Sequence, residues 1–466
     1  MHSRIILSAA VTASAVLTLT GLAAPASGTS AGRTDASVEG LWQMDGYGTA
    51  VTVSGRRMTT YDTTAVSCLP GSLKGEQQGR TGPDGSRRFL VHGGAVRVTV
   101  TPRKSGSARL HIASSTGTRI LHRIAALPTA CAKKPTADPR AVFDVFWQTY
   151  AENYPFFAAK HVDWEKVRDR FRPRLGKDTG DDELFAVLRE MIEPLHDAHT
   201  GLSDGKEREY GGLRPDTPPH SPEDLARIDT AVGRAVGVPL RQYASGALSF
   251  ARLPEGTGYL RITRFVGYTA EASYAKWEAE LEAALASIPW RSLTGLVLDV
   301  RVNGGGADPL GLRVAARLTD RPYTAYSKYA RNDPTDPTRF TQGQPSTVRP
   351  HHGPRFDGPV AVLTGPLSVS AAETFTQALM ARTPAPVRIG QNTQGVFSDT
   401  LERALPNGWT FSLPNEEFRT AEGTTFDGPG IPPHHRTPVF TEEELSQGHD
   451  SALKKARELL RRGSTG

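Results

Sequence analysis

From Gly258 onward, segments with the pattern of a buried strand alternate with segments that have the pattern of a helix, and this order limits the fold more than any other feature. The strand patterns cover residues 259–262, 295–300 and 360–364, and the helix patterns cover residues 270–287 and begin again after Asp308 and after Ser370. Such alternation is typical of a sheet covered by helices. Residues 258–460 are therefore predicted to form an α/β core, interrupted by a polar, Pro-rich insertion over 323–356 near its functional face.

The chain before this core changes character twice. Short alternating apolar runs separated by Gly, Pro and Asp turns predict a small β-barrel or sandwich over residues 38–132. After a Pro-bearing linker, apolar residues repeat at three- and four-residue steps, which predicts a helical subdomain over 138–204. Residues 205–257 are polar and Pro-rich, and we expect a loop or lid there.

Residues 1–26 have the three zones of an export signal: a charged start, an apolar run, and the small-residue sequence Ala24-Pro25-Ala26. We expect cleavage after about Ala26, a flexible lead-in over 27–37, and a secreted protein without stable membrane insertion after cleavage. An uncleaved membrane anchor is the alternative.

The two cysteines of the chain, Cys68 and Cys131, are most simply a disulfide in an exported protein. Such a bond would tie the middle of the β domain to its end. Two free buried thiols are the alternative.

The formal net charge of +6 is spread along the chain without a dense basic block. A nucleic-acid partner would require a clustered basic face with interleaved aromatic residues, which the sequence does not contain. We therefore expect no nucleic-acid partner.

Ser370 lies where a predicted strand becomes a predicted helix, in the sequence Ser370-Ala371-Ala372-Glu373. Unpaired backbone amides and the positive end of a helix dipole favour an alkoxide and a developing oxyanion at such a position. Ser-x-x-Glu before an apolar helix is also the signature of a capping box. Ser370 is thus either a nucleophile or a cap, and Ser368 is a competing cap.

A glycine turn follows another apolar strand, in the sequence Asn303-Gly304-Gly305-Gly306. Three glycines allow backbone amides to approach a ligand closely. A phosphate cradle is disfavoured, because no Gly-Lys-Ser/Thr follows and the dinucleotide spacing Gly-x-Gly-x-x-Gly is absent. The turn is a candidate oxyanion site, with a plain tight turn as the alternative.

His196 and His199 flank Asp197 after a helix pattern. This pair could bind a metal ion, but no third ligand stands at a suitable spacing, so we predict no metal and no cofactor. A general base for Ser370 and a surface histidine are the two remaining interpretations of His199.

Six motifs occur in the order seen in one enzyme family. They cover residues 258–265, 299–306, 370–373, 390–395, 405–408 and 428–433. Over about residues 140–460 the chain resembles the tail-specific (carboxy-terminal processing) protease family. The resemblance implies a crotonase-like (ClpP/crotonase) α/β core and peptide hydrolysis through an acyl-enzyme on Ser370. The oxyanion would be held by the Ala371 amide and by one amide of Gly304, Gly305 or Gly306.

Departures from the family pattern indicate which branch of the family the chain resembles. The lysine base of the bacterial processing branch would fall on Val396, so a Ser-Lys dyad is not expected. The chain resembles instead the tricorn protease core, in which an acidic residue supports a histidine base. His199 falls on that histidine, and Asp427 falls on the acidic position, where Glu is usual. Reserve candidates for the acidic position are Glu416, Glu417 and Glu422.

Other departures leave more than one function open. Ala198 stands where the tricorn-like branch has a serine, His434 stands where the last motif often has Asp, and residues 200–258 are too few for the usual PDZ module. We expect a secreted serine-type endopeptidase that acts on a peptide or protein substrate. The alternatives are a non-catalytic ligand-binding protein on the same scaffold, like the interphotoreceptor retinoid-binding proteins, and an esterase or amidase.

Overall fold

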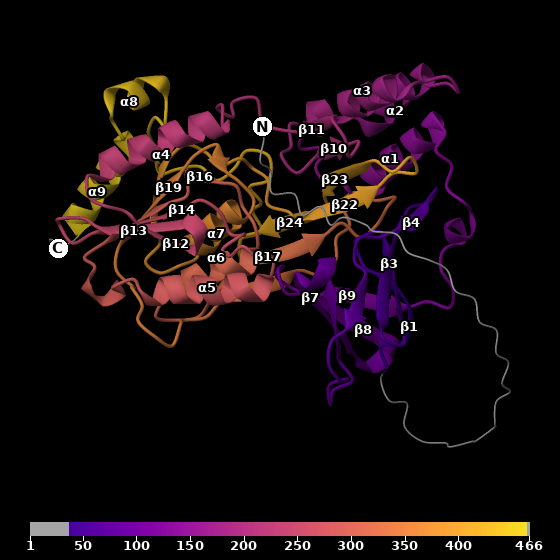
Figure 1. Ribbon diagram of the computed structural model, residues 1–466, viewed down its shortest axis with the longest axis horizontal. Helices are drawn as coiled ribbons and strands as arrows, with labels where there is room; N and C mark the ends of the chain where they lie inside the picture. The colour runs from indigo at the N-terminus through magenta and orange to yellow at the C-terminus, as the bar shows by residue number, and fades with distance from the viewer. Residues whose placement is uncertain (1–36, 464–466) are drawn as a thin grey trace.

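The computed structural model describes residues 37–463, so the predicted export signal over 1–26 lies outside the described residues. A β-barrel, a group of helices beside it and a larger α/β core follow one another along the chain (Figure 1). No helix within 37–463 is long and apolar enough to cross a membrane.

The N-terminal barrel consists of antiparallel strands. They are β1 (Gly40–Met44), β2 (Thr49–Ser54), β3 (Arg57–Thr63), β4 (Cys68–Pro70), β5 (Gly75–Gln77), β6 (Arg87–Val91), β7 (Val96–Pro102), β8 (Ser107–Ile112) and β9 (Arg119–Arg123). β2 pairs with both β1 and β3, which closes the sheet. The predicted disulfide is confirmed: Cys68 in β4 is bonded to Cys131, which follows β9. The all-β prediction for this region is also confirmed.

Three helices pack beside the barrel: α1 (Pro139–Asn153), α2 (Trp164–Phe171) and α3 (Asp181–Ile192). α1 begins after Asp138, whose side chain accepts hydrogen bonds from the first-turn amides. The apolar faces of these helices join the inside of the barrel and residues of β22 (Thr400–Ala404) and β23 (Thr410–Pro414) in one hydrophobic cluster. The barrel is therefore fixed to the rest of the molecule through a shared core.

A mixed sheet forms the centre of the α/β core. In spatial order its strands are β12 (Arg241–Tyr243), β13 (Leu248–Arg252), β14 (Gly258–Ile262), β15 (Leu296–Asp299), β19 (Val360–Thr364), β21 (Val387–Gly390) and β25 (His435–Arg436). The strands from β14 to β25 run parallel, and β12 and β13 form an antiparallel edge. The α/β prediction is confirmed.

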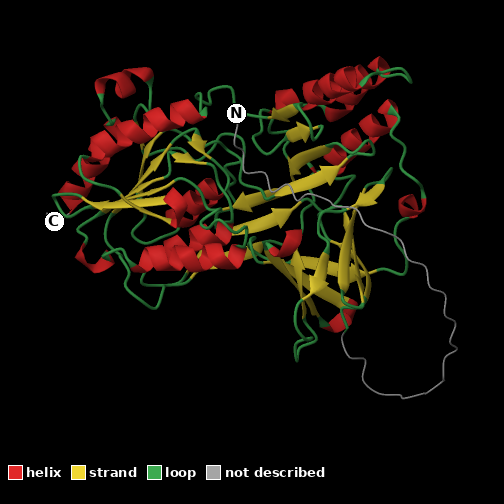
Figure 2. Ribbon diagram, in the orientation of Figure 1, coloured by secondary structure: helices red, strands yellow, loops and turns green. Residues whose placement is uncertain are grey.

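Helices cover both faces of this sheet (Figure 2). One face packs against α5 (Tyr274–Ala286), α6 (Asp308–Ala316) and α7 (Ala371–Met380), and the other packs against α4 (Pro222–Val236) and α9 (Ser451–Gly463). Alternate residues of each strand face opposite sides, as Leu298 and Val297 do in β15, so both faces are apolar. The short helix α8 (Glu442–Gln447) precedes α9.

Smaller sheets connect these parts. β10 (Gly201–Ser203) and β11 (Glu209–Gly211) extend the β22–β23 pair, β16 (Val302–Asn303) pairs with β20 (Leu367–Ser368), and β17 (Tyr323–Ala330) lies between β18 (Gln344–Val348) and β24 (Glu416–Arg419). The β16–β20 pair joins the glycine turn to the segment that carries Ser370.

Two segments are more regular than their composition indicated. Residues 205–257, expected to be a loop or lid, contain β11, α4, β12 and β13, so this segment contributes a helix and two strands to the core. α4 starts at a capping box between Ser221 and Asp224 and buries only a narrow apolar stripe, which explains why its polar sequence hid it. Residues 323–356, expected to be a polar insertion, contain the β17–β18 hairpin.

Candidate active site

Ser370 lies at the turn from β20 into α7, as its N-cap residue, with φ 58° and ψ −116°. A residue that only caps a helix usually has an extended backbone, and a positive φ is costly for a residue with a Cβ. The capping interpretation therefore accounts for the position of Ser370 but not for its backbone. Ser368 does not compete, because its hydroxyl donates to Val300 O at 2.7 Å and accepts from Gly365 N at 3.0 Å.

Glu373 holds this strained turn in place. Its fully buried carboxylate accepts hydrogen bonds from the amides of Ser370 at 3.1 Å, Gly395 at 2.6 Å and Val396 at 2.9 Å. Burial raises the pKa of Glu373 to about 7, although the amide donors lower it. The sequence indicated Glu373 only as a capping residue, and its contacts with residues 395–396 had no local signal.

Glu373→Gln is expected to lower both stability and activity. The amide nitrogen cannot accept, so at least one buried backbone amide loses its partner, at a cost of about 1–3 kcal/mol. A shift of Ser370 by about 1 Å would reduce kcat/KM by ~10²-fold. Thermal unfolding and peptide hydrolysis measure the two effects. Glu444→Gln is the matched control: Glu444 is buried and accepts from Ser451 N at 2.9 Å, but it lies on α8, so it should lower only stability.

The glycine turn packs directly against Ser370. A Cβ on Gly305 would lie 2.7 Å from Ser370 Cβ and 3.2 Å from Ala371 N, and Gly305 has φ 85°, so only glycine fits. Two of the three candidate oxyanion amides are already engaged: Gly304 donates to Thr263 O at 3.2 Å and Gly305 donates to Asn303 Oδ1 at 2.9 Å. Among the described residues, the Ala371 and Gly306 amides have no acceptor. The geometry thus narrows the candidate donors to these two.

His199 comes from the turn that follows α3. Asp197 fixes this turn, because its Oδ1 accepts from the His199 amide at 2.9 Å and its Oδ2 accepts from Tyr154 OH at 2.9 Å. The imidazole is buried, so the surface interpretation is wrong, and Nδ1 has no hydrogen-bond partner in the described part of the chain. Burial lowers the pKa of His199, and the charges of Asp197 and Asp399 oppose this only in part. A neutral imidazole with a free nitrogen can accept a proton.

Asp427 lies in the same buried region. Its carboxylate accepts from Phe397 N at 3.3 Å and from Thr425 Oγ1 at 2.6 Å. Burial raises the pKa of Asp427 well above its ordinary value, and the charges of Glu373 and Asp197 raise it further. Between residues 37 and 463, no hydrogen bond joins the His199 imidazole to Asp427 or to Ser370. Ser370 and Asp427 thus both contact residues 396–397, while in the described part of the chain no hydrogen bond joins the His199 side chain to either of them.

The reserve carboxylates have other partners. Glu416 accepts from Tyr47 OH at 2.6 Å and pairs with Lys328 at 3.2 Å, Glu417 pairs with Arg419, and Glu422 is exposed. Asp427 therefore remains the best candidate for the acidic position. No group of His, Cys, Asp or Glu side chains within 37–463 is arranged to hold a metal ion.

Two segments of the chain match known protein families. Residues 256–437 match the model of peptidase family S41, and residues 135–193 match the tricorn protease C1 domain. These two matched segments belong to the tail-specific protease family. Members of peptidase family S41 are serine peptidases. The S41 segment contains Ser370 and Asp427, and the tricorn C1 segment contains the helices that precede His199.

The known proteins that resemble this chain differ in how much of the chain they match. The chloroplastic C-terminal processing peptidase of Tetradesmus obliquus is 30% identical over 97 residues, which are 21% of this chain and 19% of that protein, so the match spans about a fifth of the relative. A candidate peptidase from Parabacteroides merdae is 26% identical, with a TM-score of 0.60 over 70% of this chain and 97% of that chain. Mature CPAF complexed with lactacystin, at 13% identity and a TM-score of 0.51 over 70% and 99% of the two chains, shares the fold.

Proposed function

We propose that this protein is a secreted serine endopeptidase with a crotonase-like core, in which Ser370 attacks a peptide carbonyl and forms an acyl-enzyme. The observation that carries the proposal is the strained backbone of Ser370, with φ 58° at the N-terminus of α7 and Gly305 packed against it. A strained turn from strand to helix presents a nucleophilic hydroxyl, and the helix dipole stabilises developing negative charge. Membership of a serine peptidase family supports the same reaction.

In this mechanism His199 is the general base. Burial keeps its imidazole neutral, and burial also opposes ionisation of Asp427. The Ser370 proton moves to His199 as the serine oxygen bonds to the carbonyl carbon, and the imidazolium formed is stabilised by the ionised form of Asp427, since each charge lowers the cost of the other in the buried site. The Ala371 and Gly306 amides donate to the oxyanion as charge develops on it.

The mechanism requires the His199 imidazole to approach Ser370. Because Nδ1 has no partner among the described residues, rotation of the ring breaks no hydrogen bond at that atom. Catalytic hydrogen bonds are often long or misaligned before substrate binds and tighten in the complex. We therefore assign closure of the triad to substrate binding.

The acid limb of the pH profile of kcat/KM is expected to lie below pH 6.5. The base must be neutral, and burial lowers the pKa of His199 from 6.5, so the active form persists to lower pH than it would with an exposed histidine. The measurement is kcat/KM for one peptide across the acid range, with thermal unfolding followed at each pH. Because burial raises the pKa of Glu373 to about 7, the profile is repeated with Glu373→Gln, and an inflection well above pH 6.5 that persists in this variant would contradict the assignment.

No hydrogen bond joins the His199 imidazole to Ser370 among the described residues, so a second function is also tested. This second function is ligand binding on the same scaffold without catalysis. A fluorophosphonate separates the two, because only an activated serine reacts with it. Simple esters assayed beside a peptide library separate an esterase or amidase from a peptidase.

Secretion is part of the proposal. It rests on the export-signal pattern of residues 1–26 and on the Cys68–Cys131 disulfide. Disulfides persist in oxidising compartments and are rare in reducing ones.

A further inference from the structure

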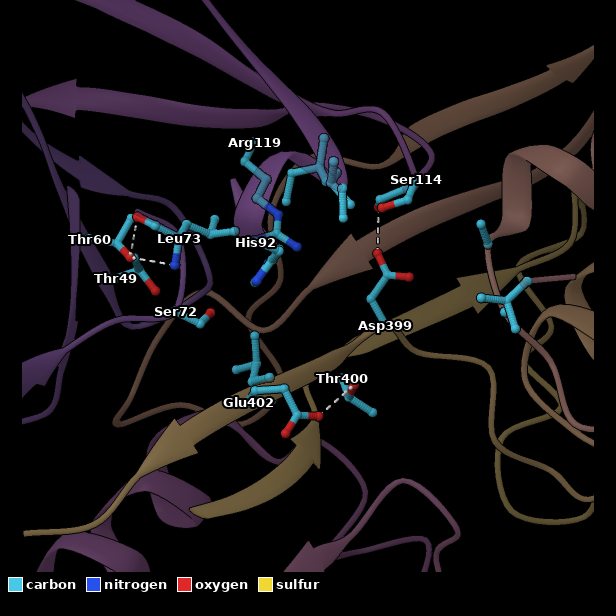
Figure 3. Close-up of a pocket in the computed structure, with 18 of the residues that line it drawn as sticks. Thr49, Thr60, Ser72, Leu73, His92, Ser114, Arg119, Asp399, Thr400 and Glu402 are labelled. Carbon is cyan, nitrogen blue, oxygen red and sulfur yellow. Dashed lines mark hydrogen bonds between the residues drawn. The ribbon is translucent and has the colours of Figure 1, made fainter. Parts of the chain in front are cut away.

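A cavity of about 460 Å³ lies between the barrel and the core and ends at the glycine turn. Gly306 and Ala307 line it from the turn, Asp399 and Glu402 from the segment that follows Val396, and Arg119 from β9 of the barrel. Figure 3 shows Arg119 reaching into this space from the barrel side, opposite the strand that carries Glu402. The cavity thus begins beside a candidate oxyanion donor and leads away from the reacting atoms.

A second cavity, of about 850 Å³, lies on the outer side of Arg119, between β8–β9 and the β17–β18 hairpin. Arg119 lines both cavities, and Arg103 and Arg109 line the outer one. The two cavities therefore share Arg119, and the Lys328–Asp399 ion pair stands between their other walls. We refer to the two cavities together as the barrel groove.

Arg119 is held in place without a direct ion pair among the described residues, although its charge acts on nearby Asp399. Its guanidinium stacks on the Tyr47 ring at 4.0 Å from the centroid, and its only hydrogen-bond contact among the described residues is the Met44 sulfur, at 4.0 Å. A stacked guanidinium is pre-organised, and its edge can donate two parallel hydrogen bonds to a carboxylate. Arg103 and Arg109 are exposed and form no ion pair with any residue between 37 and 463.

Two acidic side chains of the groove are paired with a lysine or an arginine, and a third contacts a histidine that carries charge only when protonated. Asp399 pairs with Lys328 at 3.1 Å, Asp62 pairs with Arg403 at 3.1 Å, and Asp45 contacts His122 at 2.9 Å. Glu402, on the far wall, accepts from Thr400 Oγ1 at 3.2 Å and has no cation partner in the described part of the molecule. The three arginines therefore leave the barrel side of the groove positively charged.

We propose that the barrel groove binds an acidic segment of the polypeptide substrate, with Arg119 contacting the acidic side chain nearest to the scissile bond. This inference rests on the proposed peptidase function, and it gives the N-terminal barrel a role in substrate selection. Charge-assisted hydrogen bonds to Arg119 supply orientation, and the outer arginines attract the segment at longer range.

The test measures peptide binding without hydrolysis, in the protein that carries Ser370→Ala. Fluorescent peptides with both ends blocked carry either a run of glutamates or the same run as glutamines, and anisotropy gives their affinities. The glutamate peptide should bind about 10-fold tighter at low salt, which corresponds to one charge-assisted contact, and less so at high salt. Arg119→Gln should remove most of this preference for the glutamate peptide. A separate variant with Arg103→Gln and Arg109→Gln should show a smaller loss of the preference.

Arg97→Gln is the matched control, because Arg97 is exposed on β7 but lines neither cavity, and it should keep the full preference. Equal affinities for the two peptides would overturn the inference, as would a glutamate preference that survives Arg119→Gln in a folded protein. Hydrolysis is measured separately with Ser370 present. A charge preference in binding without any cleavage would therefore reject the proposed function and leave this inference standing.

Discussion

Replacing Ser370 by alanine is expected to lower kcat for peptide hydrolysis by ~10⁶-fold and to abolish labelling by a fluorophosphonate, because the attacking oxygen is removed. Residual turnover would come only from binding and from the oxyanion donors. The fold should persist, since the loss of an N-cap side chain costs about 0.5–2 kcal/mol. Hydrolysis of a peptide library, labelling and thermal unfolding measure the three effects.

Ser368→Ala is the matched control for this variant. The Ser368 hydroxyl lies two residues away, is fully buried, and bonds to Val300 O and Gly365 N rather than facing the glycine turn. Its loss should lower stability by about 1–3 kcal/mol and leave labelling in place. Hydrolysis that survives Ser370→Ala would remove Ser370 from the mechanism.

The position of Ser370 could be predicted because its signal is local. A buried strand, a short turn and an apolar helix follow one another within residues 360–380, and each has its own periodicity. The strain at Ser370 could not be predicted in the same way. It depends on Gly305 and on the contacts of Glu373 with residues 395–396, which only the folded chain brings to the turn.

The barrel illustrates the same limit. Its strands alternate in sequence and were predicted, but its attachment to the core joins residues that are far apart in the chain. Tyr47 donates to Glu416, and Lys328 lies 3.0 Å from Ser115 Oγ and 3.1 Å from Asp399. Because these contacts have no periodicity, the sequence left the barrel without a role, although it lines a cavity that reaches the glycine turn.

His199→Asn is expected to lower kcat by ~10⁴ to 10⁶-fold, because the variant has no group that can take the Ser370 proton near neutral pH. Fluorophosphonate labelling should fall with kcat, since labelling requires the same activated oxygen. Adding Ser370→Ala to this variant should cause little further loss, because groups that act as one unit are not additive. Steady-state kinetics and labelling rates of the single and double variants measure this.

His196→Asn separates a base from a structural histidine of the same turn. His196 is exposed and has φ 46°, a left-handed conformation that asparagine tolerates, so this variant should keep its activity. If His199→Asn instead retained full labelling of Ser370, proton transfer would have to pass through another group. Asp427 could not replace it as a base without ionising in a buried site that raises its pKa, so the ligand-binding alternative would then become the better account of the scaffold.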